Sequence, residues 1–139
     1  MYKKMHNYIF ALLPVIFSGF IYIFFRSEDI LLFSWIRLFN IDYSLVRYNN
    51  IEHNTITLYI IYSLPNGLWV LSGLLLLKMV IKNNKKVLLL YSILFVAISI
   101  FIEIGQYFGI ILGTFDVFDL ITIIVFSIVG LIISLRGVK

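Results

Sequence analysis

Four polar side chains stand in two evenly spaced pairs within the C-terminal third of an otherwise very apolar sequence. Glu103 and Gln106 are three residues apart, and so are Asp116 and Asp119. Residues three apart share one face of a helix, so each pair directs its side chains the same way. Neighbouring carboxyl groups can act as acid and base, or can hold Mg²⁺ or Ca²⁺ through their oxygen atoms. These four residues are therefore the first candidates for a functional site.

The composition indicates the kind of protein that must position them. The chain has 139 residues, of which 62% are hydrophobic and only 13% are charged. A soluble globular domain has roughly 45–50% apolar and about 25% charged residues. A chain this small has too much surface for its volume to hide so many apolar side chains from water. The composition excludes a soluble enzyme, a disordered protein and a nucleic-acid-binding domain, and predicts an all-α integral membrane protein.

Other site chemistries find little support. The chain has no cysteine, which excludes disulfides, thiolate nucleophiles and thiolate zinc sites. His6 and His53 are isolated from each other and from the apolar runs, so a histidine-liganded metal site is not expected. We expect no resident metal or cofactor, although three carboxylates alone could hold a hard cation. Whether the protein is an enzyme stays open, because paired carboxyls could work as acid and base but no nucleophile or substrate anchor is evident.

Four apolar runs are long enough to cross the ~30 Å hydrocarbon layer as helices rising 1.5 Å per residue. We predict transmembrane helices at about 7–25, 65–81, 87–108 and 117–135, a four-helix bundle that makes residues 1–139 a single membrane domain. The first run could be a cleaved signal peptide, but no small-residue cleavage site follows it, which favours a retained anchor.

Residues 29–64 are predicted to form an interfacial helical segment between spans one and two, on the outer side. The stretch Asp29–Phe39 is mixed in character, with Ser34 and Arg37 on one helical face and apolar side chains elsewhere. Pro65 and Gly67 predict a break near the start of the second span. One long kinked helix over residues 56–81 is the alternative.

The basic residues predict the orientation. Lysines and arginines gather before span one, in the Lys82–Lys86 turn and after span four, whereas the connection between spans three and four has none. Because basic residues concentrate on the cytoplasmic side, both termini and that turn are predicted to be cytoplasmic. The chain is then a multi-pass protein of the cytoplasmic (inner) membrane. The lysines mark its inner side, and no nucleic-acid partner is expected.

In this orientation Glu103 lies within the outer leaflet. It is 16 residues beyond Val87, which corresponds to ~24 Å along a helix. A carboxyl at that depth costs several kcal/mol unless it is protonated, hydrated or paired. Candidate partners are Arg37, Arg47, Asn66 and Trp69. Alternatively, Glu103 is protonated and donates a hydrogen bond to a neighbouring carboxylate.

Simpler structural roles compete for the other candidates. Asp116 can cap the fourth span, with Asp119 in its first turn. Gln106 can form a hydrogen bond between helices. At the outer end of the second span, Trp69 can be an interfacial anchor and Asn66 can satisfy free backbone N–H groups. The predicted binding site combines residues that three spans bring to one side: Asn66, Trp69, Glu103, Gln106, Asp116 and Asp119.

The same residues carry a family resemblance. The sequence resembles the VanZ-like membrane family at Glu103-Ile104-Gly105-Gln106, then at Gly113 to Leu120, and at Gly130. It also resembles a recurring element of the small members of that family at Ser63-Leu64-Pro65-Asn66-Gly67-Leu68-Trp69. The resemblance covers about residues 63–131. It implies a small cell-envelope membrane protein, and the family's namesake is associated with low-level antibiotic resistance, to the glycopeptide teicoplanin.

Two functional hypotheses follow. In the first, the chain is a VanZ-like envelope protein whose polar, acidic site on the outer side binds a lipid headgroup, a lipid-linked glycan precursor or a cation. In the second, the chain is an assembly subunit of a homo-oligomer or a larger membrane complex, which could include an oligomeric pore. In both, the lipid bilayer is the immediate partner.

Overall fold

The computed structural model describes residues 2–25, 38–39 and 54–138, and within these ranges the chain is helical with no strand. The elements in chain order are α1 (Tyr2–Phe25), α3 (Thr55–Leu58), the π-helical turn η2 (Tyr59–Ser63), α4 (Leu64–Val80), α5 (Lys85–Tyr107) and α6 (Val117–Leu135). Among the described residues, four stretches are long and apolar enough to cross a membrane: Tyr8–Phe25, Thr55–Val80, Lys85–Tyr107 and Val117–Leu135. The predicted all-α, four-helix architecture is confirmed at this level.

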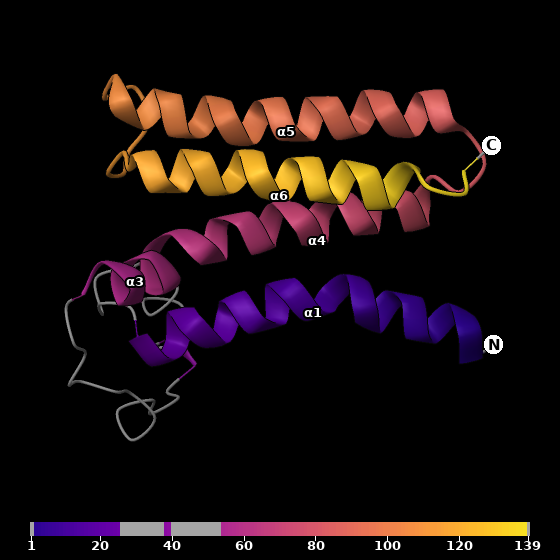
Figure 1. The fold of residues 1–139 in the computed structure, drawn as a ribbon, viewed down its shortest axis with the longest axis horizontal. Helices are drawn as coiled ribbons and strands as arrows, with labels where there is room; N and C mark the ends of the chain where they lie inside the picture. Colours follow the sequence, from indigo (N-terminus) through magenta and orange to yellow (C-terminus); the bar gives the residue numbers. More distant parts are fainter. Residues whose placement is uncertain (1, 26–37, 40–53, 139) are drawn as a thin grey trace.

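Helix α4 is the centre of the arrangement. It packs most extensively against α6 on one side and α1 on the other, while α5 lies along α6 and α4. Figure 1 shows the helices in the order α1, α4, α6, α5, with both chain ends and the α4–α5 turn at one end of the bundle. The α5–α6 connection and α3 lie at the opposite end. The connection that lacks basic residues is thus at the far end from both termini.

Small residues let α4 and α6 approach closely. A Cβ atom on Gly67 would lie 2.5 Å from Phe126 Cδ2, and one on Gly130 would lie 2.6 Å from Leu74 Cδ1. Ser127 and Ser134, on the same stripe of α6 as Gly130, are also buried. Small residues at such contacts are typical of helix packing in membranes. The buried apolar cluster of Val70, Leu74 and Ile123 fills the space between the two helices.

Hydroxyl groups fasten α1 to α4. Ser72 Oγ donates to the Ala11 carbonyl over 2.6 Å, and Ser18 Oγ donates to the Pro65 carbonyl over 3.4 Å. All four of these residues are buried. Hydrogen bonds of this kind stabilise contacts between apolar helices in a membrane, where burial of apolar surface favours no particular neighbour.

The region before Pro65 differs from the expected interfacial segment. Residues 55–64 are helical and continue directly into α4, so the alternative of one long helix describes this part of the chain. The physical reason is the π-helical turn, in which the Leu64 N–H donates to the Tyr59 carbonyl, five residues back. This wider turn accommodates Pro65, which has no N–H to donate and whose ring would crowd a regular α-helix. Of the remaining predicted segment, residues 29–37 and 40–53 lie outside the described residues.

The other helix ends follow from capping. Helix α5 begins at Lys85, two residues before the predicted start, because the Asn84 side chain accepts a hydrogen bond from the Val87 N–H over 3.0 Å. Helix α1 begins at Tyr2, and its stretch that is apolar enough to cross a membrane, Tyr8–Phe25, agrees with the predicted 7–25. The bounds of α6 coincide with the predicted fourth span.

Candidate functional site

One cavity of about 460 Å³ lies at the end of the bundle that carries the α5–α6 connection. All six residues predicted as a site line it: Asn66, Trp69, Glu103, Gln106, Asp116 and Asp119. The remaining lining residues are Tyr22, Tyr62, Val70, Ser99, Ile102, Gly113, Thr114 and Ile123. Side chains from α1, α4, α5 and α6 therefore meet at one place.

Three polar residues on one face of α5 form the first wall of the cavity. Ser99, Glu103 and Gln106 follow at spacings of four and three, which places them on one stripe of the helix. Glu103 is buried, with 4% of its surface exposed. Gln106 lies against Gly113 of the connection, where a Cβ atom would come within 2.7 Å of Gln106 Cδ. Gly113 also has φ +146°, a backbone conformation that side chains disfavour.

The start of α6 forms the second wall. Asp116 caps the helix, because its Oδ1 accepts a hydrogen bond from the Phe118 N–H over 2.9 Å. Its own backbone N–H donates to Glu103 Oε1 over 3.2 Å, which ties α5 to α6. Asp119 follows in the first turn and is 9% exposed. The capping role expected for Asp116 is thus observed, and it leaves the residue on the cavity wall.

Helix α4 and the turn before it form the third wall. Asn66 is half-buried, whereas Trp69 is 59% exposed and lies at the rim. Tyr62 lies on the same stripe, four residues before Asn66 and seven before Trp69. Tyr22 of α1 completes the lining. The sequence reasoning missed both tyrosines; the spacing of residues 62, 66 and 69 was the available signal for Tyr62.

The charge of the lining is acidic. Among the described lining residues there are three carboxylic acids and no lysine, arginine or histidine. Arg37 and Arg47, considered as partners of Glu103, lie outside the described residues. No group of three or more histidine, cysteine, aspartate or glutamate residues in the described part of the chain is arranged to hold a metal ion.

The lining is thus rich in hydrogen-bond acceptors. Carboxyl and amide oxygens accept from hydroxyl and ammonium groups, and Trp69, Tyr22 and Tyr62 contribute aromatic surface. Thr114 adds a hydroxyl that can donate or accept, whereas Ser99 Oγ donates to the Phe95 carbonyl over 3.0 Å and can only accept from a ligand. The arrangement suits a polar group rich in donors.

Comparisons of the chain with protein-family models, with curated proteins and with solved structures find no match.

Proposed function

We propose that the chain is a VanZ-like, multi-pass protein of the cytoplasmic membrane, with both termini inside and the acidic cavity open to the outer face. The distribution of basic residues supports this orientation. Eight of the eleven lysines and arginines lie in the sequence at the start of α1, around the α4–α5 turn and after α6, and these segments share one end of the bundle (Figure 1). The other three, Arg26, Arg37 and Arg47, are accompanied by four acidic residues in the connection after α1. That end is cytoplasmic under the positive-inside rule.

In this proposal the cavity binds the headgroup of a membrane lipid or of a lipid-linked glycan precursor. A phosphate in the cavity would meet three carboxyl groups and, among the described lining residues, no basic side chain. Hydroxyl and ammonium groups instead match the carboxyl and amide acceptors. The face of Trp69 at the rim can lie against a sugar ring or a cation. The favoured headgroup is therefore recognised through hydroxyls or an ammonium group.

A single observation carries the proposal: one cavity of about 460 Å³ gathers all six candidate side chains from α4, α5, α6 and the connection before α6. Its volume lies within the roughly 300–1,000 Å³ of small-molecule sites. Because the cavity lies near an end of the bundle, a headgroup can enter it while the acyl chains remain in the bilayer.

Lipid retention tests the site. The full chain is placed in phosphatidylcholine nanodiscs with equal amounts of monoglucosyl diacylglycerol and phosphatidylethanolamine, and native mass spectrometry measures the lipid retained. We expect the wild type to retain one of these lipids at least fivefold over phosphatidylcholine. The two lipids distinguish recognition of hydroxyls from recognition of an ammonium group.

Glu103→Gln and Asp119→Asn should each lower that retention at least fivefold. Ser134→Ala is the control, because it also removes a buried polar group but at the opposite end of α6. Wild-type retention by both acid variants, or no preference by the wild type, contradicts the proposed site.

A phenotype tests the proposed family relationship. Expression of the wild-type chain in a susceptible host is expected to raise teicoplanin tolerance, and Glu103→Gln at matched protein level should remove the gain. Equal tolerance with and without the wild-type chain would contradict the VanZ-like role.

The assembly hypothesis rests on a different surface. The outward faces of α1 and α5 expose large apolar side chains, among them Phe17, Phe20, Leu90 and Phe101. A face of this kind fits lipid chains or a second copy of the protein. Light scattering after purification in mild detergent distinguishes them: a stable dimer or larger complex supports assembly, and a monomer contradicts it.

A further inference from the structure

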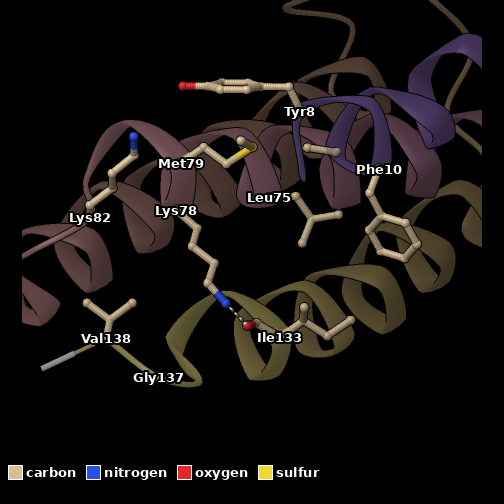
Figure 2. Close-up of a pocket in the computed structure, with 10 residues that line it drawn as sticks. Tyr8, Phe10, Leu75, Lys78, Met79, Lys82, Ile133, Gly137 and Val138 are labelled. Atoms are coloured by element: carbon tan, nitrogen blue, oxygen red, sulfur yellow. Dashed lines mark hydrogen bonds between the residues drawn. The ribbon is translucent and has the colours of Figure 1, made fainter. Parts of the chain in front are cut away.

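A second cavity of about 450 Å³ lies at the opposite, basic end of the bundle (Figure 2). It is bounded by α1, by α4 with the residue Lys82 that follows it, and by the end of α6. Its lining comprises Tyr8, Phe10, Ala11, Leu75, Lys78, Met79, Lys82, Ile133, Gly137 and Val138. None of these residues lines the acidic cavity.

Hydrogen bonds from α4 hold both walls. On one side, Ser72 Oγ donates to the carbonyl of Ala11 in α1 over 2.6 Å. On the other, Lys78 Nζ donates to the carbonyls of Ile133 and Arg136 over 2.8 and 3.1 Å. These carbonyls belong to the C-terminal end of α6, where a helix favours a cation. These hydrogen bonds therefore fix the positions of α1 and the end of α6 on either side of the cavity.

The lining combines apolar walls with amines. Phe10, Leu75, Met79, Ile133 and Val138 supply hydrocarbon surface, and no carboxylate is present among the described lining residues. Lys78 has used two of its three N–H donors on α6 and keeps one. Figure 2 shows the Lys82 amine directed away from Ile133, toward the side of the cavity that carries Tyr8. Lys82 is exposed, so its charge is accessible at the mouth.

We infer that this cavity binds one anionic phospholipid. An acyl chain lies against the apolar walls, and the phosphate lies against Lys82 and the Tyr8 hydroxyl, on the side of the cavity away from Ile133. The argument is charge complementarity: an apolar cavity whose described lining residues include two amines and no acid matches an amphiphile with an anionic head. Basic pockets between membrane helices on the cytoplasmic side are suited to such headgroups. The inference does not depend on the function proposed for the acidic cavity.

Native mass spectrometry tests the inference on the full chain in mixed micelles that contain equal amounts of phosphatidylglycerol and phosphatidylcholine. We expect one phosphatidylglycerol to be retained per chain, at least tenfold over phosphatidylcholine. Lys82→Gln should lower this retention at least fivefold. Lys86→Gln is the matched control, because Lys86, in the first turn of α5, carries the same charge at the same end of the bundle but does not line the cavity.

Three results would overturn the inference. Equal losses in Lys82→Gln and Lys86→Gln would show a diffuse basic surface in place of a site. Equal retention of both lipids would remove the role of the anionic head. Displacement of phosphatidylglycerol by millimolar glycerol 3-phosphate would show a site for free phosphate. Glu103→Gln, in the other cavity, should leave phosphatidylglycerol retention unchanged, which separates this test from the test of the proposed function.

Discussion

Glu103 of α5 and Asp116, the residue before α6, are joined by a hydrogen bond in which the Asp116 backbone N–H donates to Glu103 Oε1 over 3.2 Å. The first N–H groups of a helix and of its cap have no partner within the helix. Here the Glu103 side chain of the preceding helix, α5, accepts from one of them. At the same time Asp116 Oδ1 accepts from the Phe118 N–H. The Glu103 carboxyl thus positions Asp116, whose own carboxyl also lines the cavity.

Substitution of Glu103 should loosen this connection in a graded way. Glu103→Leu removes the acceptor, and a single hydrogen bond contributes about 0.5–1.5 kcal/mol, so amide exchange at Asp116 should accelerate roughly two- to tenfold. Glu103→Gln keeps an acceptor oxygen and should retain most of the protection. Hydrogen–deuterium exchange of the α5–α6 connection measures both. Equal protection in the wild type and Glu103→Leu would show that the bond does not order the connection.

Two glycines should respond oppositely to alanine. In Gly67→Ala, the new Cβ would lie 2.5 Å from Phe126 Cδ2 and 2.6 Å from Thr122 Cγ2, at the contact between α4 and α6. Overpacking of this kind costs about 1–3 kcal/mol of folding free energy. Gly19→Ala is the matched change, because nothing lies within 4 Å of its Cβ position. It should stabilise α1 by about 0.5–1 kcal/mol. Unfolding by sodium dodecyl sulfate in mixed micelles gives both values, and a stabilising Gly67→Ala would contradict the close approach.

The long helices could be predicted from the sequence because each is an apolar run bounded by polar residues. The bounds of α6 follow from Asp116, a capping residue directly before such a run. The helical continuation through residues 55–64 was harder to predict, because Pro65 and Gly67 ordinarily end or weaken a helix. Whether the chain breaks there depends on the turn before the proline. The π-helical turn Tyr59–Ser63 leaves no distinct mark on the composition of the segment.

The cavity was predictable where polar residues repeat at helical spacing. Glu103 with Gln106, and Asp116 with Asp119, are conspicuous because they interrupt apolar surroundings. Tyr22 was not predictable in this way, because its place on the wall depends on how α1 packs against α4, which is set by the Ser72 and Ser18 hydrogen bonds. The basic cavity was missed for a similar reason. In the sequence its lysines indicate only the orientation of the chain, and the space between them exists only in the packed structure.

The two serine bonds between α1 and α4 should contribute unequally. Ser72 and Ser18 are equally buried, at 2% and 0% exposed, but their bonds are 2.6 and 3.4 Å long. Hydrogen bonds between membrane helices contribute about 0.6 kcal/mol on average and up to about 1.7 kcal/mol. Ser72→Ala should therefore lower the free energy of unfolding by an amount close to the upper value of about 1.7 kcal/mol. Ser18→Ala should lower it by less than the average of about 0.6 kcal/mol. The same micelle titration measures both, and a larger loss in Ser18→Ala would contradict the bond lengths.

Labelling of single cysteines should determine which end of the bundle faces outward. The chain has no cysteine, so one cysteine can be introduced at a time. Leu112 in the α5–α6 connection is 100% exposed, and Asn83 in the α4–α5 turn is also exposed. The positive-inside rule predicts that a membrane-impermeant maleimide labels Leu112→Cys in intact cells but labels Asn83→Cys only after permeabilisation. The reverse pattern would place the acidic cavity on the cytoplasmic side, and recognition of an outer-face headgroup would then be wrong even if both cavities bind lipid.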